Sequence, residues 1–290
     1  MKPQSARVKT LLVSLVITVL AGYSRAQSDG TPPPPFNGIA HVAIRVHDLA
    51  ASVAFYEKLG FEQAFDLRKN DVPYESFIKI NDHQFIELYP TTEHDPKPGF
   101  MHLCFEGVDL NAIYDDYIGR GLTPTAVRKA GAGNLLFTMV GPEEQNIEYT
   151  QYMPGSLHSK DQGQHLGADR ISKEIWGVSL RMEDPVLART FYEQNLGFHE
   201  SRNALEPGLI PLLLPGTSGQ VVEITPGADQ VLFAVPSVRH AASQLNEANI
   251  AFEKHDSMLT VQDPDGNRLV FLTVESETGW RLPQIPWLKR

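Results

Sequence analysis

Four side chains able to bind a metal recur at matched spacing in the first half of the chain. They are His41, Glu87, His102 and Glu148, at intervals of 46, 15 and 46 residues, so the order His-then-Glu repeats once. Two imidazoles and two carboxylates suit a divalent ion such as Zn, Ni, Fe or Mn and leave room for water or substrate oxygens. If the two halves of this region are related by a pseudo-twofold axis, the four side chains converge. The sequence therefore predicts one divalent metal ion there.

Each of the four lies in a predicted β-strand, at an equivalent place in its half. The strands that carry them are Ile39–Val46, Gln84–Tyr89, Phe100–Phe105 and Ile147–Tyr152. Because side chains alternate along a strand, Ala43 and Arg45 share the face of His41. A single His or Glu on a strand is more often a satisfied core or rim residue than a ligand. The matched positions of all four favour the metal site.

The strand that carries His41 opens a motif that recurs along the chain. Residues Gly38–Phe61 read GIAHVAIRVHDLAASVAFYEKLGF, a strand followed by a helix that begins after Asp48 and ends before Gly60. Three further strands complete a βαβββ unit, and the same order returns from Phe100. A looser pair of units starts at Ile175. The sequence predicts an α+β protein of two similar domains, each a pair of βαβββ units.

Composition shifts divide the chain. We expect the first domain over 37–152, a polar, glycine-containing interdomain linker over 153–173, and the second domain over 174–275. A C-terminal tail over 276–290 contains two tryptophans and is expected to lie over a domain surface.

The N-terminus is typical of an exported protein. A basic start precedes the apolar run Thr10–Gly22, and Ser24 and Ala26 supply the small residues of a cleavage site. The apolar run is short for a membrane span, although a retained membrane anchor is the alternative. We predict a signal peptide over 1–26, a proline-rich leader over 27–36, and a periplasmic or secreted protein that does not associate with the membrane after cleavage.

Net charge and cysteine content exclude several kinds of partner and a disulfide. Lys and Arg number 25 against 35 Asp and Glu, a net charge of −10, and no basic cluster appears. Nucleic-acid binding and anionic-membrane binding are therefore not expected, and the predicted partner is a small-molecule substrate. The only cysteine, Cys104, excludes an intramolecular disulfide and is expected to pack as a small buried residue.

Both halves of the chain resemble the vicinal oxygen chelate superfamily, which includes glyoxalase I, methylmalonyl-CoA epimerase, extradiol dioxygenases and the fosfomycin and bleomycin resistance proteins. The resemblance rests on Gly38–Phe61 and on FIELYP, FMHLCF and GPEEQNIEY, which begin at Phe85, Phe100 and Gly141. It implies two tandem domains, each a curved mixed sheet built from paired βαβββ units, with a metal inside the first.

The set of two His and two Glu most resembles that of glyoxalase I and the epimerases. The resemblance implies that all four side chains bind the metal, that Glu148 is the catalytic base, and that Glu87 can serve the opposite face of the substrate. It also aligns Arg45 with an arginine that contacts glutathione, so Arg45 is a candidate substrate-binding residue. A surface salt bridge is the alternative role for Arg45.

Departures from the glyoxalase pattern argue against a glutathione adduct. Thr91 and Pro98 replace an Asn and an Arg, and Gly141–Gln145 replaces the usual DPDGN turn. In the second domain the ligand positions are assigned to Gly177, Glu223, Leu232 and Val270, which predicts a degenerate domain without metal. A complete site then requires the units of the first domain to pair with each other, or two copies to exchange units in a homodimer.

Three functions remain open from the sequence. The first is an exported glyoxalase-like isomerase or lyase that moves a proton on a small vicinal-oxygen substrate. The second is an extradiol-type ring-cleaving dioxygenase that uses His41, His102 and Glu148. The third is a non-catalytic protein that binds a small molecule.

Overall fold

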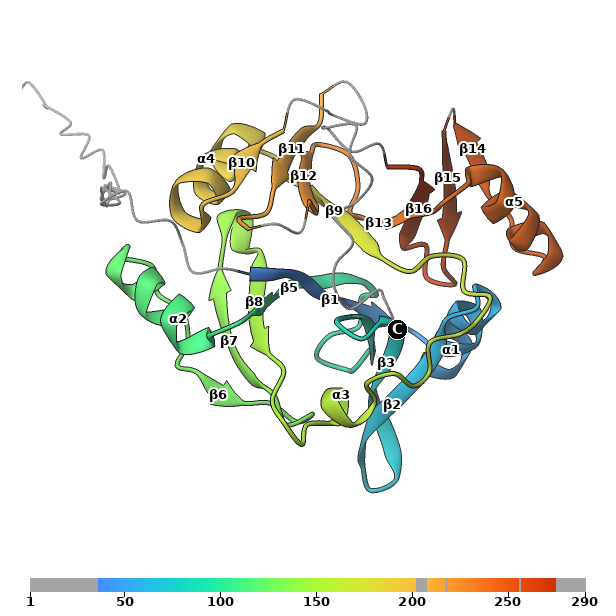
Figure 1. Ribbon diagram of the computed structural model, residues 1–290, viewed down its shortest axis with the longest axis horizontal. Helices are drawn as coiled ribbons and strands as arrows, with labels where there is room; N and C mark the ends of the chain where they lie inside the picture. Colours follow the sequence, from blue (N-terminus) through green and yellow to red (C-terminus); the bar gives the residue numbers. More distant parts are fainter. Residues whose placement is uncertain (1–35, 202–207, 217–218, 256, 275–290) are drawn as a thin grey trace, which may run out of the picture.

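The computed structural model describes residues 36–201, 208–216, 219–255 and 257–274 (Figure 1). The expected signal peptide, the leader up to residue 35 and the tail over 276–290 lie outside the described residues, so these expectations stay predictions. Within the described part of the chain, no helix is both long and apolar enough to cross a membrane.

The first half of the chain forms one eight-stranded mixed sheet with the order β2-β3-β4-β1-β5-β8-β7-β6. Its strands are β1 (Phe36–Val46), β2 (Glu62–Lys69), β3 (Val72–Asn81), β4 (Gln84–Pro90), β5 (Gly99–Gly107), β6 (Arg128–Lys129), β7 (Leu135–Val140) and β8 (Asn146–Gln151). At its centre β1 pairs antiparallel with β5, while β4 runs parallel to β1 and β8 parallel to β5. The two units of the first domain therefore pair with each other within one chain.

The second half repeats this arrangement with the order β10-β11-β12-β9-β13-β16-β15-β14. Its strands are β9 (Ile175–Arg181), β10 (His199–Glu200), β11 (Ile210–Leu213), β12 (Val221–Thr225), β13 (Gln230–Ala234), β14 (Glu253–His255), β15 (Met258–Gln262) and β16 (Arg268–Leu272). Two mixed sheets with few helices confirm the predicted tandem α+β fold.

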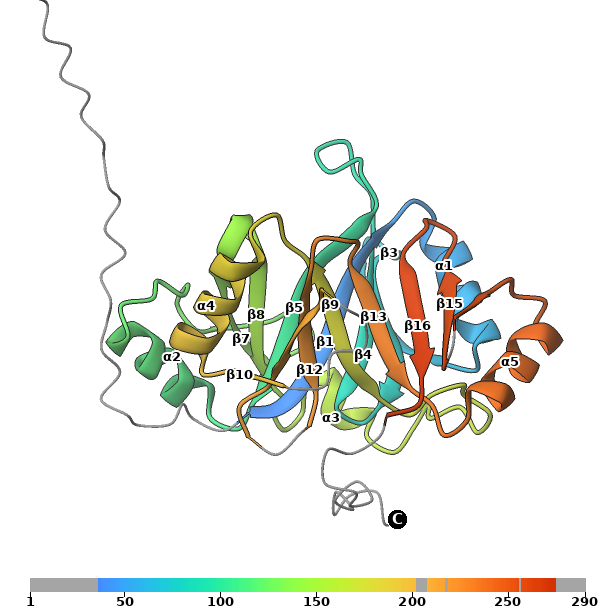
Figure 2. The same ribbon diagram turned by 90° about the horizontal axis from the view of Figure 1, so that it is seen from above.

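Four longer helices lie at the two outer ends of the sheets, α2 and α4 at one end and α1 and α5 at the other (Figure 2). They are α1 (Leu49–Lys58), α2 (Leu110–Gly119), α4 (Pro185–Leu196) and α5 (Val238–Glu247). An oxygen of an N-cap side chain accepts a backbone N–H at the start of each: Asp48, Asp109, Asp184 and Ser237. The predicted caps of α1 are confirmed, with Asp48 at its start and Gly60, whose φ is 80°, directly after its end.

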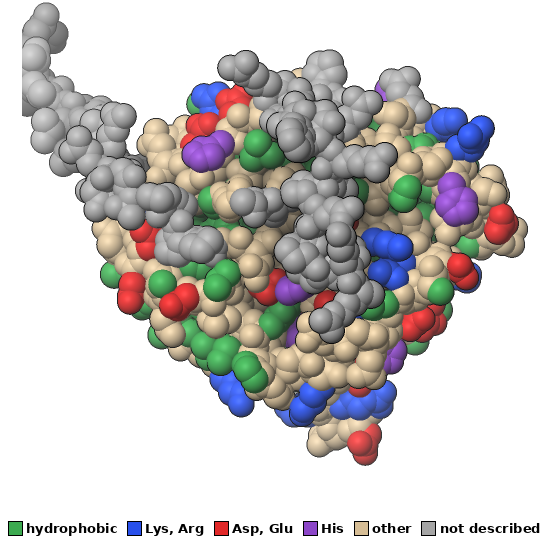
Figure 3. All heavy atoms as spheres, in the orientation of Figure 1, with side chains coloured by type: hydrophobic (Ala, Val, Ile, Leu, Met, Phe, Trp, Pro, Cys, Tyr) green, Lys and Arg blue, Asp and Glu red, His purple; other side chains and the backbone are tan. Residues whose placement is uncertain are grey.

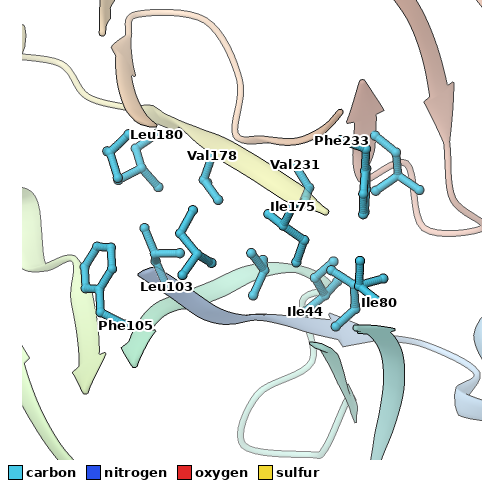
Figure 4. Close-up of a cluster of buried hydrophobic side chains, with 14 of the residues drawn as sticks. Ile44, Ile80, Leu103, Phe105, Ile175, Val178, Leu180, Val231 and Phe233 are labelled. Atoms are coloured by element: carbon cyan, nitrogen blue, oxygen red, sulfur yellow. The ribbon is translucent and has the colours of Figure 1, made fainter. Parts of the chain in front are cut away.

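The two sheets pack against each other through one apolar core. Along β1, Val42 and Ile44 belong to this core, whereas His41 lies on the opposite face by strand alternation. Figure 4 shows Ile44 and Leu103 of the first sheet opposite Val178 and Val231 of the second. The second domain therefore covers the back of the strands that carry the candidate ligands.

Hydrogen bonds between the domains are reciprocal. Gln84 bonds both the N–H and the carbonyl of Ile175, at 2.8 and 2.9 Å, at the start of β9. In return Gln220 accepts from the N–H of Ile39 at 2.7 Å, at the start of β1. In each domain, a glutamine at or just before the start of the fourth strand therefore bonds to the first strand of the other domain.

A second reciprocal pair joins a turn of each domain to a helix start of the other. The carboxylate of Glu143 accepts from the N–H groups of Glu183 and Asp184, at 2.9 and 2.8 Å, immediately before α4. The carboxylate of Asp265 accepts from the N–H of His47 at 3.0 Å, immediately before α1, and also contacts the His47 ring. The accepted N–H groups lie at or just before the N-cap residues, so these bonds fix the chain where each helix begins.

The segment expected to be a linker contains a short helix, α3 (Leu157–Lys160), that packs on the first sheet. The N–H of Leu157 donates to the carbonyl of Ala132 at 2.8 Å. Lys79 of β3 is fully buried, and its Nζ lies 2.7 Å from a carboxylate oxygen of Asp161 and 2.9 Å from Asp82. This part of 153–173 is therefore a fixed part of the first domain's interior.

The predicted βαβββ order requires a strand near Thr123–Arg128, but only the two residues of β6 are paired there. Pro124 supplies no N–H to a ladder. The Thr125 hydroxyl accepts instead from the N–H of Thr138 at 2.9 Å, so a side chain replaces a backbone partner.

Surface charges are mixed. On the face seen in Figure 3, Lys and Arg side chains lie in small separate groups among acidic, polar and apolar ones. This face offers no continuous basic band for a nucleic-acid backbone.

Candidate metal centre

The four candidate ligands come from the four central strands of the first sheet. His41 lies on β1, Glu87 on β4, His102 on β5 and Glu148 on β8. Ala43 pairs with Glu87 and Cys104 with Glu148, and each of these small residues stands two positions after a candidate histidine. The two units thus place their His and Glu in the same way about the antiparallel β1–β5 pair.

The structure brings all four side chains together. The Nε2 atoms of His41 and His102 are 3.1 Å apart. Nδ1 of His41 lies 3.0 Å from Oε1 of Glu87, and its Nε2 lies 3.4 Å from Oε1 of Glu148. The three residues His41, Glu87 and His102 are each less than a tenth exposed.

Burial sets the protonation of the two imidazoles. It lowers the pKa of His102 to about 4, and burial together with the neighbouring His102 holds the pKa of His41 well below its usual range. Both rings are therefore neutral at neutral pH, which is the form that binds metals.

The two carboxyls respond in the opposite direction. Burial raises the pKa of Glu148 to about 7. Burial, with Glu75 and Glu148 nearby, holds the pKa of Glu87 well above its usual range. Like charges disfavour each other in such a space, so the ionised pair needs a cation for compensation. A divalent ion fits this donor set of two neutral imidazoles and two carboxylates.

A tyrosine fixes the orientation of Glu87. The hydroxyl of Tyr89 lies 2.6 Å from Oε1 of Glu75 and 3.0 Å from Oε2 of Glu87. Burial also raises the pKa of Glu75. This Glu75–Tyr89–Glu87 chain was not predicted from the sequence, because Glu75 comes from β3 and only strand pairing places it beside β4.

A cavity of about 180 Å³ opens beside three of the four side chains. A cavity of this size favours a small molecule as its ligand. Its walls include His41, Glu87 and Glu148, together with Arg128 and His158. His158 lies on α3, so its place in this cavity was not predicted from the sequence.

Residues 38–148 match the family profile of the glyoxalase, bleomycin resistance protein and dioxygenase superfamily. This region belongs to that superfamily.

Several solved structures share the fold over most of the chain. An extradiol ring-cleaving dioxygenase from Brevibacterium fuscum aligns with a TM-score of 0.66 and 17% identity, covering 86% of this chain and 75% of that chain. The 2,3-dioxygenase LapB from Pseudomonas sp. KL28 aligns at 0.63 and 15%, covering 84% and 94%. The Mn(II)-bound glyoxalase from Novosphingobium aromaticivorans aligns at 0.63 and 17%, covering 82% of each chain. A search of curated proteins found no significant match.

Strand register within the superfamily fold corrects one assignment in the second domain. Gly177 pairs with Leu232, as His41 pairs with Cys104. Leu232 is therefore the counterpart of Cys104, and the counterpart of His102 is Gln230, two residues earlier. The sequence assignment of Leu232 was wrong because the apolar run Val231–Ala234 offers no polar marker for the register.

Apolar packing occupies the equivalent place in the second domain. A Cβ on Gly177 would lie 2.6 Å from Cγ2 and 2.7 Å from the carbonyl oxygen of Val221. Leu232 and Val270 pack with Val221 in a small apolar cluster. Glu223 is retained and accepts from the hydroxyl of Ser179 at 2.7 Å.

The remaining sequence candidates lie around the site. Cys104 is fully buried, as expected, and burial holds the pKa of its thiol well above the usual range. Arg45 lies 3.4 Å from Asp95, an exposed residue of the β4–β5 loop, and is not among the residues that line the cavity. Its role in substrate binding stays a prediction.

Proposed function

We propose that this chain is an exported, glyoxalase-like metalloenzyme of isomerase or lyase type that transfers a proton on a small vicinal-oxygen substrate. The observation that carries the proposal is the second carboxylate. Glu87 lies 3.0 Å from one nitrogen of His41, and Glu148 lies 3.4 Å from the other. Carboxylates from two strands therefore flank the paired histidines.

His41, Glu87, His102 and Glu148 would hold one divalent ion, for which Zn, Ni, Fe and Mn are candidates. When bound, such an ion supplies Lewis-acid stabilisation of negative charge on neighbouring substrate oxygens.

Glu148 is proposed as the base. One of its carboxylate oxygens takes the proton from a hydroxyl-bearing substrate carbon next to a carbonyl and returns it to the former carbonyl carbon. The hydroxyl proton passes to the former carbonyl oxygen, so the substrate is isomerised without net change in protons. Glu87, held by Tyr89, can act on the opposite face of the substrate. The cavity volume favours a substrate of a few carbons over a glutathione conjugate.

Elemental analysis of the purified protein tests the metal site. We expect one equivalent of divalent metal in the wild type and a large loss in His41→Ala after dialysis. The matched control is His199→Ala, because His199 is exposed on β10 of the second domain. A full equivalent retained by His41→Ala would contradict the site.

Proton exchange tests the reaction. The metal-loaded protein is incubated with hydroxyacetone in deuterated water, and deuterium at the carbon beside the carbonyl is followed by NMR. We expect exchange in the wild type and its loss in Glu148→Gln, with metal content measured in both. Bound metal without exchange would favour a non-catalytic small-molecule binding protein.

A second candidate is an extradiol-type ring-cleaving dioxygenase. It is favoured by the fold similarity to two dioxygenases, one of them an extradiol ring-cleaving enzyme, and by His41, His102 and Glu148, which form a two-histidine, one-carboxylate set. Anaerobic loading with Fe(II), followed by catechol and oxygen, separates the candidates. No oxygen uptake with any catechol would exclude this function.

Export is tested separately. The N-terminal sequence of the protein recovered from the periplasm or medium of the producing cells should begin at Gln27. A mature chain that still begins at Met1 would contradict it.

A further inference from the structure

The candidate metal centre faces a histidine that plays no part in the proposed proton transfer. His158 lines the same cavity as His41 and Glu148 but comes from α3, outside the βαβββ units. Only 4% of its surface is exposed, and its Nε2 has no hydrogen-bond partner among the residues that the structure describes. A buried donor or acceptor left unpaired is costly, so it indicates a partner that the protein itself does not supply.

Asn134 fixes which nitrogen of His158 carries the proton. Oδ1 of Asn134 accepts from the N–H of Met153 at 3.2 Å, so the NH₂ group of the same amide is directed at His158. That NH₂ group lies 2.8 Å from Nδ1 of His158, which must therefore accept. Burial and the nearby Lys79 ammonium lower the pKa of His158 to about 3, so the ring is neutral. A neutral ring that accepts at Nδ1 carries its hydrogen on Nε2.

Packing holds the ring in place. Tyr152 stacks on it, with centroids 4.6 Å apart and planes at 15°. Three phenylalanines meet it edge to face: Phe65, Phe77 and Phe85. The ion pair between Lys79 and Asp161, the residue directly after α3, fixes the C-terminal end of this helix. A donor held in this way before the ligand arrives loses little entropy on binding.

We propose that His158 is a substrate-binding residue whose Nε2–H donates a hydrogen bond to an oxygen of the ligand bound in the cavity. This inference rests on the proposed function, because it places the ligand beside the metal ligands. It selects small molecules that present an acceptor oxygen, such as a carbonyl, hydroxyl or phenolate, towards α3. Molecules that present only N–H groups there would leave Nε2–H unpaired and would bind less tightly.

The test measures binding rather than turnover. Zinc-loaded protein is titrated with 4-nitrocatechol, a small chromogenic ligand with two adjacent oxygens, and the dissociation constant is read from its absorbance. His158→Phe keeps an aromatic ring among its aromatic neighbours but removes the donor, whereas His158→Gln keeps an N–H donor. His199→Phe, on the exposed strand β10, is the matched control.

We expect His158→Phe to weaken binding by about 5–30-fold, the range for one lost hydrogen bond to a buried partner. His158→Gln should recover part of the lost affinity, and the dissociation constant of His199→Phe should equal that of the wild type. All four proteins should bind one equivalent of zinc, because His158 is not a proposed ligand. Equal affinity in wild type and His158→Phe would overturn the inference while leaving the metal centre intact. A wild type that binds no zinc would overturn the proposed function, and the inference with it.

A measurement on the wild type covers the case in which His158 variants do not fold. In ¹⁵N-labelled protein, the ring signals of His158 should show the Nε2–H tautomer, and 4-nitrocatechol should shift the Nε2 proton downfield. The Nδ1–H tautomer, or an Nε2 proton unchanged at saturation, would contradict the proposal.

Discussion

The ammonium of Lys79 and the carboxylate of Asp161 form an ion pair of 2.7 Å inside the protein. Lys79 is fully buried on β3, and its Nζ also lies 2.6 Å from the carbonyl oxygen of Asp161. This pair joins the first sheet to the residue that follows α3. The helix that carries His158 is therefore held on the first domain by a buried charge.

Lys79→Met should unfold more easily than the wild type by about 3–5 kcal/mol, because it leaves the carboxylate of Asp161 buried without its cation. Urea unfolding measures the change. The control is Lys160→Met, which removes an exposed lysine from α3 itself and should change stability by less than about 0.5 kcal/mol. Equal effects of the two substitutions would show that the buried pair does not hold α3.

Cys104→Ala should keep one equivalent of metal. Cys104, His41 and Glu148 can approach one another closely enough to bind an ion, so the thiol is a rival ligand. Its counterpart in the first unit is Ala43, however, and the site is symmetric without sulfur. Elemental analysis after dialysis decides between the two. A loss of metal as large as that in His41→Ala would identify Cys104 as a ligand.

Gly177→Ala should destabilise the protein by about 1–3 kcal/mol, because the added methyl group would overlap the backbone and side chain of Val221. The control is Gly119→Ala at the end of α2, where a Cβ would meet no atom of the described structure within 4 Å. That substitution should stabilise by about 0.4–1 kcal/mol through the unfolded chain. Both values come from urea unfolding. A neutral Gly177→Ala would show that the second domain has room for a side chain at the position of the first histidine.

Acidification should cost the wild type more stability than His158→Phe. The pKa of His158 is about 3 in the folded protein against an ordinary value of 6.5. Below pH 6.5 the unfolded chain therefore takes up a proton that the folded chain does not. The stability linked to this group is complete above pH 6.5 and is lost as the pH falls towards 3.

At about 1.36 kcal/mol per pH unit, the difference between the two proteins should change by about 2 kcal/mol between pH 6.5 and 5. Glu148, whose raised pKa of about 7 acts in the opposite direction, is present in both proteins and cancels in the comparison. Urea unfolding at several pH values measures the two slopes. Parallel slopes would place a charged His158 in the folded protein.

The sequence carried enough information to predict the fold and the gathering of the four candidate ligands. Both follow from a repeat, since equal intervals from His41 to Glu87 and from His102 to Glu148 require equivalent strands. The two ends of α1 were also predictable, because the capping bonds of Asp48 and Gly60 join residues only a few positions apart in the chain.

Features that depend on how distant strands align were not predictable. The sequence analysis assigned Leu232 to the position of His102, and only the pairing of β13 with β9 shows that Gln230 stands there. His158 lies in a polar segment without periodicity, and the side chains that bury its ring, among them Phe65 and Phe77, lie far before it in the chain. Glu75 was not singled out from the sequence, because only the pairing of β3 with β4 brings it to the hydroxyl of Tyr89.

The reciprocal bonds between the domains have a consequence for how the two halves depend on each other. Gln84 and Gln220 exchange equivalent bonds, as do Glu143 and Asp265, so the contact has the form of an isologous dimer interface written into one chain. Such an interface requires equivalent contact residues on both of its sides. The second domain can therefore lose all of the candidate metal ligands except Glu223 and still keep its half of the contact, because the first domain cannot cover the back of its own sheet without this related partner.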